Sequence, residues 1–360
     1  MAWLLGLAAL LAASPLLMSL RWVAVVSVPQ VRPKARTTLI LPYAPPGDLG
    51  PLAAALAAQT LAPQHLILAV ARAEDAPPLD FPHRLVIAGP ASRRGQKCQN
   101  QLAALATLSG EEEVIVLLDA DIRPQPWWLA TLIEPICRGS HSIVGGYRWS
   151  IPEAGLVAQL VAWLDRSWAL LPKPRLFGLA WGGSLALAPA ALPLVRAALD
   201  RAVSDDLMLA RAARRARLPM LARGAVLPAS PLGAGAIGFW LRQLRMLRLH
   251  NAPMWWLQGL VSHAGLLLWA VALMGEPWLV LALSATGLLR ALCQDRAARR
   301  VGLPDTPATR AWQCALSASP LPDLFAVGCL WASAFGRRVT WRGRTYRIGR
   351  DGTAEVAPGQ

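Results

Sequence analysis

The sequence has little charge for its length. Only 16% of its 360 residues are Asp, Glu, Lys or Arg, whereas a soluble domain usually carries about 25%. Hydrophobic residues make up 55% of the chain, which indicates that part of it lies in a membrane. Acidic residues are scarcer than basic ones, 21 against 36, so the formal net charge is +15. This balance suits nucleic acid or an anionic membrane surface, and the hydrophobicity favours the membrane and no nucleic acid.

Cysteine is also scarce, and the five cysteines follow no metal-binding or disulfide pattern. They are Cys98, Cys137, Cys293, Cys314 and Cys329. They form no CxxC or Cys/His spacing, which argues against a structural zinc and against a disulfide framework. Free thiols are typical of a cytoplasmic compartment.

The first twenty residues carry no charge. A helix of that length crosses a bilayer about 30 Å thick, because each residue adds about 1.5 Å. The first cation, Arg21, follows the apolar run, whereas a secretory signal peptide begins with basic residues. We therefore expect residues 1–30 to form a retained transmembrane anchor.

Further apolar runs lie in the C-terminal part of the chain. Residues 253–275 and 278–293 predict a pair of spanning helices. The last run, 311–336, is interrupted by Pro320, Pro322 and Asp323, and each half is too short to span a bilayer. We expect residues 253–336 to form a transmembrane pair followed by a re-entrant or interfacial hairpin.

The positive charges indicate an orientation in the membrane. Basic residues follow the first apolar run, occupy the loop after residue 293 and are frequent in the tail over residues 337–360. Positive charge is retained on the cytoplasmic side of membranes. We therefore expect an integral protein of the inner or plasma membrane, with its large middle region and its basic tail in the cytoplasm.

The middle region, residues 37–235, has the pattern of an α/β domain. Short aliphatic runs alternate with alanine-rich helical stretches, which is typical of a largely parallel sheet. Residues 153–171 have helical spacing and suit either the membrane surface or the core. Residues 236–252 predict a basic interfacial helix. The expected strands cover 37–41, 65–70, 84–87 and 114–118, and the expected helices cover 51–59, 99–108 and 126–136.

Asp119 and Asp121 directly follow the apolar run 114–118. Ligands of open α/β sheets bind at the carboxyl ends of the strands. Two carboxylates at this spacing suit Mg²⁺ or Mn²⁺ shared with a diphosphate. Asp-x-Asp also occurs in ordinary turns, so the preceding strand is what favours the functional interpretation.

Two interpretations fit Ser204-Asp205-Asp206, which opens an expected helix. In the structural one, Ser204 caps the helix and the two acids complement its dipole. In the functional one, a carboxylate is a general base that takes a proton from an acceptor hydroxyl. The local sequence leaves both open.

Arg242 and Arg245 are one helical turn apart and share a helix face. Two guanidinium groups in this arrangement are able to bind phosphate bidentately. A basic helix beside a membrane span also attracts anionic lipid, and the local sequence favours that simpler interpretation.

Taken in order, these elements resemble the ceramide glucosyltransferase family of membrane-bound nucleotide-sugar transferases over almost the whole chain. Residues 71–76 are similar to its acidic loop, and residues 95–100 to its Gly-x-Asn-x-Lys-x-x-Asn segment. Residues 242–246 are similar to its (Gln/Arg)-x-x-Arg-Trp motif, with Met246 in place of Trp. Three further motifs match, namely Asp119-Ala120-Asp121, Trp181-Gly182-Gly183-Ser184 and Ser204-Asp205-Asp206, together with the tail over residues 339–355.

The resemblance implies a GT-A α/β domain with a mostly parallel sheet, an N-terminal transmembrane helix and C-terminal transmembrane or interfacial helices. It also implies a role for each matching residue. Asp206 is the catalytic base. The nucleotide sugar is bound by Asp75, Lys97, Asp119, Arg242 and Arg245. The acceptor side is lined by Trp181, Gly182 and Gly183. Asp119 and Asp121 hold a divalent metal, Mg²⁺ or Mn²⁺.

The expected function is that of a metal-dependent hexosyltransferase. It would move glucose from UDP-glucose to a lipid hydroxyl such as that of ceramide, with inversion, at the cytoplasmic membrane face. Its partners would be the nucleotide-sugar donor, the lipid acceptor and the membrane. A processive polysaccharide synthase is one alternative, although it would need more spanning helices. A basic membrane protein that only binds lipid is the other, although it would not need carboxylates at separate strand and helix ends.

Overall fold

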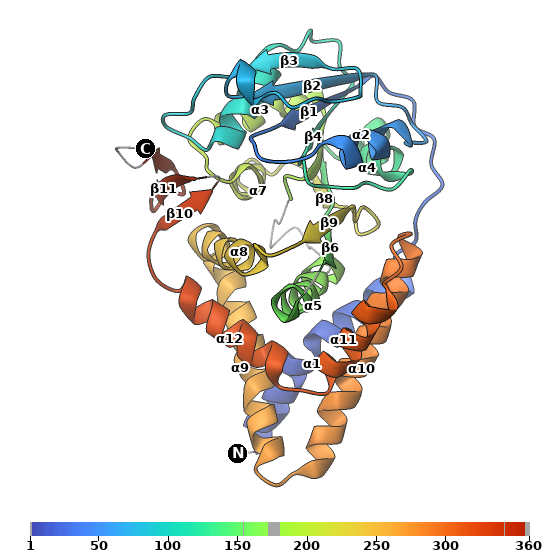
Figure 1. Cartoon of the computed structure of the whole chain (residues 1–360), viewed down its shortest axis with the longest axis vertical. Helices are drawn as coiled ribbons and strands as arrows, with labels where there is room; N and C mark the ends of the chain where they lie inside the picture. The colour runs from blue at the N-terminus through green and yellow to red at the C-terminus, as the bar shows by residue number, and fades with distance from the viewer. Residues whose placement is uncertain (1, 154, 172–180, 342, 357–360) are drawn as a thin grey trace. The chain divides into compact units, whose positions relative to one another are not determined.

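The computed structural model describes residues 2–153, 155–171, 181–341 and 343–356, which form two compact units (Figure 1). The first, here called the sheet unit, comprises Val28–Arg148, Lys173–Ser230 and Arg337–Gln360. The second, here called the helical unit, comprises Met1–Ser27, Trp149–Pro172 and Pro231–Gly336.

The sheet unit is built on a seven-stranded sheet with the order β3-β2-β1-β4-β7-β5-β8. β7 is antiparallel to β4 and β5, and the other neighbouring pairs are parallel. The four strands expected from the sequence are all present, and the sheet is mostly parallel, as predicted. The strands are β1 (Thr37–Pro42), β2 (His65–Val70), β3 (Arg84–Ile87), β4 (Val114–Leu118), β5 (Ile143–Gly145), β7 (Ser184–Leu187) and β8 (Met220–Ala222).

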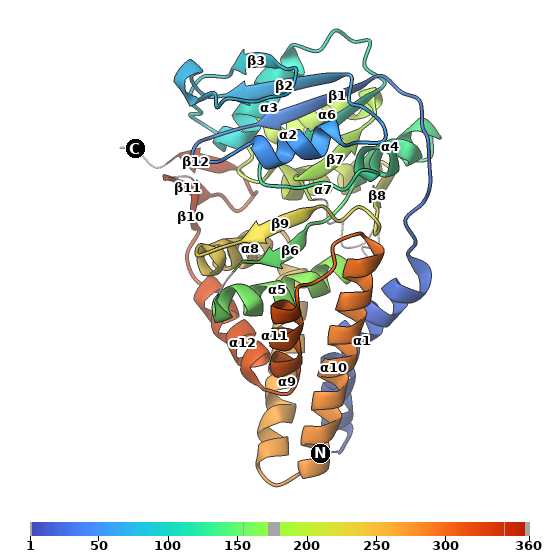
Figure 2. The same ribbon diagram turned by 45° about the vertical axis from the view of Figure 1, so that its right-hand side comes forward.

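Helices cover both faces of this sheet (Figures 1 and 2). In β4, Val114, Val116 and Leu118 share an apolar layer with residues of α2 and α4, whereas Ile115 and Leu117 share one with α3, α6 and α7. A strand that is buried on both faces has a continuous apolar sequence. This is why residues 114–118 are all apolar and do not alternate with polar residues. The helices are α2 (Gly50–Ala57), α3 (Gln96–Ala106), α4 (Trp128–Cys137), α6 (Leu192–Leu199) and α7 (Asp205–Arg215), with the short turns η1 (Ala73–Asp75) and η2 (Pro189–Ala191).

The basic tail also belongs to the sheet unit and forms a second, three-stranded sheet. Its strands are β10 (Arg338–Trp341), β11 (Arg344–Ile348) and β12 (Ala354–Val356), and both pairs are antiparallel. Arg342, which the sequence places in this tail, lies outside the described residues. The tail is therefore not only a run of positive charge but a folded part of the unit.

The helical unit contains the apolar runs. Among the described residues, α1 (Ala2–Val25), α9 (Ala252–Leu273) and α10 (Pro277–Arg300) are long and apolar enough to cross a membrane. They pack side by side (Figure 1) and expose large apolar side chains, such as Met274 at 87% and Leu281 at 72%. Apolar surface of this extent is typical of a membrane contact. The apolar helices expected at the N-terminus and in the C-terminal region are therefore present and are long enough to span a membrane.

Two of these C-terminal elements differ in detail from the expectation. α10 continues past residue 293 to Arg300, because its polar last turns are held by i,i+4 pairs such as Arg299 Nε to Asp295 Oδ2 at 2.8 Å. The run 311–336 forms α11 (Pro307–Ser317) and α12 (Leu321–Ser333), with a bend of 83° between them. Such a pair is either a broken span or a re-entrant hairpin.

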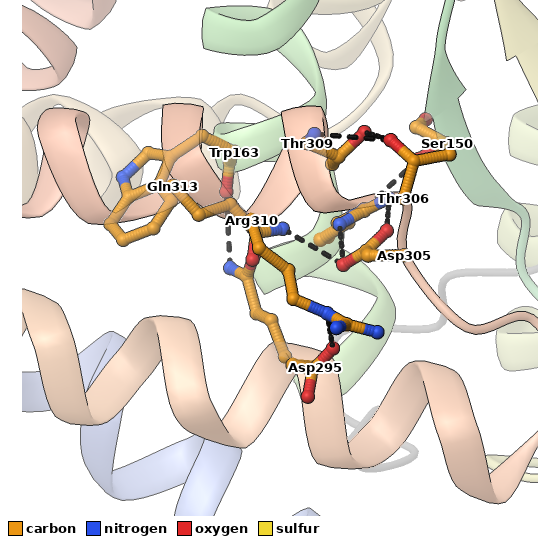
Figure 3. A network of polar contacts seen from close by, with 10 residues as sticks. Ser150, Trp163, Asp295, Asp305, Thr306, Thr309, Arg310 and Gln313 are labelled. Atoms are coloured by element: carbon orange, nitrogen blue, oxygen red, sulfur yellow. Dashed lines mark hydrogen bonds and ion pairs between the residues drawn. The ribbon is translucent and has the colours of Figure 1, made fainter.

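The remaining elements of the helical unit include α5 (Leu156–Leu170), α8 (Ala236–His250) and β6 (Trp149–Pro152), which pairs with β9 (Ala229–Leu232). α5 carries a buried ion pair (Figure 3). Arg166 donates from Nη1 and Nη2 to the Asp305 carboxylate at 2.9 and 2.8 Å, and Gln313 Nε2 donates to the same carboxylate at 3.1 Å. Trp163 and Leu160 are buried as well. Of the two positions left open for this helix, the core is the one it takes.

Candidate active site

The candidate residues of the sheet unit come from five segments at one edge of its main sheet. The parallel strands β1, β2 and β4 end there, and β7 begins there because it is antiparallel to β4. The backbone N–H of Asp119 donates to the carbonyl of Gly183 at 3.3 Å, which extends the β4–β7 ladder beyond the strands. The candidate residues lie after β2 (Asp75), at the start of α3 (Lys97), after β4 (Asp119 and Asp121), before β7 (Trp181, Gly182 and Gly183) and at the start of α7 (Asp205 and Asp206).

Lys97 lies between two carboxylates in this site. Its Nζ is 2.6 Å from Asp119 Oδ1 and 2.9 Å from Asp205 Oδ2. Gln101, one turn further along α3, donates from Nε2 to the same Asp205 oxygen at 2.8 Å. Only 11% of the Lys97 side chain and 5% of the Asp205 side chain are exposed. Because α3 begins at Gln96 rather than at 99 as expected, Lys97 and Gln101 are on one helix face.

Asp206 has a different set of partners. Its Oδ1 accepts hydrogen bonds from the Ser204 hydroxyl and from the Leu207 N–H, the latter at 2.7 Å. Its Oδ2 accepts from the Gly182 N–H at 3.4 Å. The Ser204 hydroxyl therefore orients Asp206 and makes no capping hydrogen bond to the α7 backbone. The Ser204 cap that the structural interpretation expects is therefore absent, although Asp206 does accept from a backbone N–H of the first turn of α7.

Two glycines allow the chain to pass close to the carboxylates. A Cβ on Gly182 would collide with the carboxylate of Asp205. A Cβ on Gly183 would lie 2.7 Å from Asp119 Oδ2 and would also collide with the Trp181 ring. These positions need glycine because any side chain would displace a carboxylate. The predicted acceptor segment thus lies directly against the predicted metal and base residues.

Burial and mutual charge shift the titration of the site. Burial, with smaller contributions from Asp121 and Asp205, raises the pKa of Asp119 to about 6, and Lys97 partly opposes the rise. The pKa of Asp206 is also raised, by burial and by Asp205. Burial alone would lower the pKa of Lys97, but the neighbouring carboxylates hold it well above its usual value. Lys97 therefore stays charged, and Asp206 is a better proton acceptor than an exposed carboxylate.

The other predicted residues make contacts that do not involve Lys97 or Asp206. Asp75 is half-buried, and its Oδ2 accepts from the Arg72 N–H at 3.1 Å within its own turn. Asp121 is exposed and acts on Asp119 through its charge. In the helical unit, Arg245 Nη2 donates to the Ala332 carbonyl at 3.3 Å. Arg242 lies over the Phe239 ring, 5.7 Å from its centroid. Met246 is buried.

The cluster offers two carboxylates, Asp119 and Asp121, for a metal. No group of three or more His, Cys, Asp or Glu residues that could hold a metal ion occurs in the part of the chain that the structure describes. This fits Mg²⁺ or Mn²⁺ bound through one or two carboxylates and completed by substrate phosphate oxygens.

The sequence analysis did not identify the contacts of Asp205, Gln101 and Gln96. Asp205 pairs with Lys97 and also accepts a hydrogen bond from Gln101. Gln96 donates to Asn100 Oδ1. The i,i+4 spacing of Lys97 and Gln101 was a signal that both face one partner. Asn100, kept from the family segment, donates from Nδ2 to the carbonyls of Tyr43 and Ala69 at 2.9 and 3.0 Å and so joins α3 to the ends of β1 and β2.

Comparison with solved structures finds distant likenesses. A mannosyltransferase from Pyrobaculum calidifontis, solved with GDP-Man and Mn²⁺, is 16% identical with a TM-score of 0.43, over 92% of this chain and 97% of that one. A glucosyl-3-phosphoglycerate synthase from Mycobacterium tuberculosis, solved with Mn²⁺, UDP-Glc and phosphoglyceric acid, is 14% identical with a TM-score of 0.36, over 76% of this chain and 82% of that one. Likenesses of this strength assign neither donor nor acceptor to the chain. No curated protein matches it significantly.

The family comparison is more specific. The model of glycosyl transferase family 21 matches residues 55–354, which include every candidate site residue named above. The match, together with the mostly parallel sheet and the candidate spans, bears out both the resemblance and the GT-A fold class. The chain belongs to glycosyl transferase family 21, the ceramide glucosyltransferase family, and is a glycosyltransferase.

Proposed function

We propose that this glycosyltransferase moves glucose from UDP-glucose to the hydroxyl of a membrane lipid such as ceramide, with inversion. Membership of the family and the exposed apolar helices support a lipid acceptor. The observation that supports the mechanism is that two adjacent acids, Asp205 and Asp206, have different partners. Asp205 is paired with Lys97, whereas Asp206 is held by N–H and O–H donors beside Gly182.

Asp206 is the proposed base. It takes the proton of the acceptor hydroxyl while the acceptor oxygen forms a bond to the anomeric carbon. The bond from that carbon to the diphosphate oxygen breaks, and the diphosphate leaves with the electron pair. Because attack and departure occur on opposite faces of the sugar, a single displacement inverts the configuration. The raised pKa of Asp206 supports this role, since a base is most effective when its pKa approaches the working pH.

The described edge of the sheet carries several carboxylates around the ammonium group of Lys97. These carboxylates would repel a negatively charged diphosphate, so its binding needs additional positive charge. We assign Asp119 and Asp121 to a divalent metal, Mg²⁺ or Mn²⁺, which when bound neutralises charge on the diphosphate. Asp75 and Lys97 are assigned to the nucleotide. Arg242 and Arg245 are assigned to the leaving diphosphate, and Trp181, Gly182 and Gly183 to the acceptor side.

The proposal places the protein in the inner or plasma membrane, with the glycosyltransferase domain in the cytoplasm. We propose residues 1–30 as the anchor, 37–235 as the catalytic domain, 236–252 as the interfacial helix, 253–336 as the membrane pair with its hairpin, and 337–360 as the tail. The distribution of arginine supports this orientation. A reporter fused after Gln360 would then be cytoplasmic, and a periplasmic reporter at that point would overturn the orientation.

The test uses protein purified in detergent with radiolabelled UDP-glucose, ceramide and Mn²⁺. We expect a lipid-linked β-glucoside, whose anomeric configuration NMR reports, and loss of product on adding EDTA. Asp206→Asn should lower kcat by about 10³-fold with an unchanged donor KM, because the amide accepts no proton. Asp80→Asn, at an exposed position, is the control and should match the wild type. A soluble polymer as product would replace the lipid acceptor with a polysaccharide, and wild-type kcat in Asp206→Asn would remove Asp206 from the mechanism.

A further inference from the structure

The C-terminal sheet lies against the start of α3, next to Lys97. Arg344, on β11, donates from Nη1 to Gln96 Oε1 at 2.7 Å. The backbone N–H of Gln96 donates to the Tyr346 hydroxyl at 3.4 Å, and the Tyr346 side chain is buried. The residue that precedes Lys97 is therefore held through both its side chain and its backbone by the tail.

Gln96 also forms hydrogen bonds with residues near the carboxyl ends of the main sheet's strands. Its Oε1 also accepts from the Ala91 N–H at 2.9 Å. Its Nε2 donates to the Gly89 carbonyl at 2.9 Å and to Asn100 Oδ1 at 2.7 Å. Since Asn100 is bonded to the ends of β1 and β2, a continuous hydrogen-bond network runs from Arg344 to the edge of the main sheet.

The same small sheet also holds the segment that leads into α7. The backbone N–H of Ala354 donates to the Arg201 carbonyl at 2.7 Å, and Ala202 pairs with Thr353 in an isolated bridge. Arg211, on α7, donates from Nη1 to the Asp351 carbonyl at 2.7 Å. The tail thus contacts both helices whose first turns carry the Lys97–Asp205 ion pair.

The two faces of β11 explain why Arg344 differs from Arg347. Arg344, Tyr346 and Ile348 alternate with Thr345 and Arg347, so they are on the opposite face of the strand. Tyr346 and Ile348 are buried, whereas Arg347 is exposed. Arg344 is therefore on the inward face, and Arg347, three residues later, is a matched arginine on the outward face.

We propose that the C-terminal sheet is a positioning element of the active site, and that Arg344 is a positioning residue that fixes Lys97 between Asp119 and Asp205 through Gln96. Contacts of 2.6 and 2.9 Å lengthen beyond hydrogen-bond distance when the lysine moves away by about 1 Å, and misplacement of this size costs catalysis as much as about 10²-fold. The kinetic part of this inference rests on the proposed function, because it uses the donor.

The first experiment compares Arg344→Gln with Arg347→Gln in the full-length protein by hydrogen–deuterium exchange. We expect the amides of residues 96–100 to exchange at least tenfold faster in Arg344→Gln and at the wild-type rate in Arg347→Gln. Arg344→Lys, which keeps a charged donor, should restore part of the protection. This readout needs no donor, so it remains decisive even if the wild type transfers no glucose.

The second experiment measures donor kinetics of the same variants. Arg344→Gln should raise the KM for UDP-glucose about tenfold and change kcat by less than about threefold, the reverse of the pattern expected for Asp206→Asn. Tyr346→Phe, which removes only the hydroxyl, should act in the same direction and serves if Arg344→Gln does not fold. If Arg344→Gln or Tyr346→Phe matches Arg347→Gln in both exchange and KM, the positioning role is wrong.

Discussion

Lys97 Nζ lies 2.9 Å from Asp205 Oδ2, an ion pair that joins the first turns of α3 and α7. Both side chains are nearly buried, and Asp119 and Gln101 complete their contacts. A buried charge that loses its partner is costly, whereas an exposed pair contributes little. The two adjacent acids at the start of α7 therefore differ in what their removal does.

We predict that Asp205→Asn lowers the stability of the sheet unit. It leaves Lys97 with one carboxylate partner fewer in a buried place, and we expect a loss of about 2–3 kcal/mol in the free energy of unfolding. Chemical unfolding followed by tryptophan fluorescence measures it. Asp200→Asn is the control, since Asp200 pairs with Arg93 and Arg94 at a position that is much less buried than that of Asp205. Equal losses in the two variants would contradict the importance of the buried pair.

We predict that Gly182→Ala disrupts the site without removing any polar group. The added Cβ would collide with the Asp205 carboxylate, which must then move away from Lys97. Donor turnover should fall by about 10²-fold, in line with the cost of misplacing a catalytic group. Gly47→Ala is a matched control, because its Cβ would come no closer than 3.5 Å to Tyr43. Full turnover in Gly182→Ala would show that the close approach is not required.

Metal binding should depend on the ionisation of Asp119. Its pKa of about 6 means that the carboxylate is mostly ionised at pH 7 and mostly protonated at pH 5. We expect the affinity for Mn²⁺ in the presence of UDP to fall about tenfold between these two pH values, because the metal binds the ionised form. Calorimetric titration measures this, and Asp119→Asn should bind weakly at both. An unchanged affinity in the wild type would rule out Asp119 as a ligand.

The raised pKa of Asp119 makes metal affinity rise with pH, but it makes the stability of the fold decrease with pH. The pKa of Asp119 in the folded chain is above its ordinary value of 3.8, so the folded state binds the proton more tightly than the unfolded state. Stability from this group therefore falls as the pH rises from about 3.8 to about 6 and is constant above that range. Asp119→Asn should remove this component from the pH dependence of unfolding.

Arg242 and Arg245 are predicted to act on the diphosphate rather than on lipid. Replacing either by alanine should lower transfer in detergent by about 10²-fold, as the loss of a transition-state donor does. If they only attracted anionic lipid, each would contribute about 1 kcal/mol at a charged surface and nothing in neutral detergent. Rates in detergent distinguish the two roles. A change of less than about threefold would defeat the diphosphate assignment.

Several features of this protein follow from the sequence alone. The strands β2, β3 and β4 have the bounds that the sequence predicts. In β4 the aliphatic run is unbroken because a strand buried on both faces admits no polar residue. The long apolar runs identified the candidate spans, since a helix needs about twenty predominantly apolar residues to cross a bilayer. Asp119 and Asp121 at the end of β4 were found in the same way, because a chain leaving a parallel strand emerges at the ligand edge.

The tertiary structure decided the contacts within the site. Asp205 and Asp206 are equivalent to any local argument, and only the position of α3 against α7 determines that Asp205 meets Lys97 while Asp206 faces Gly182. The sequence predicted a basic cytoplasmic tail, whereas the fold shows that alternate residues of β11 are on an inward face and that Arg344 contacts Gln96. The sequence lists which charges are available. Which of these charges become partners depends on how helix ends and strand faces from distant parts of the chain pack together. The strength of each ion pair or hydrogen bond then depends on distances of a few ångströms.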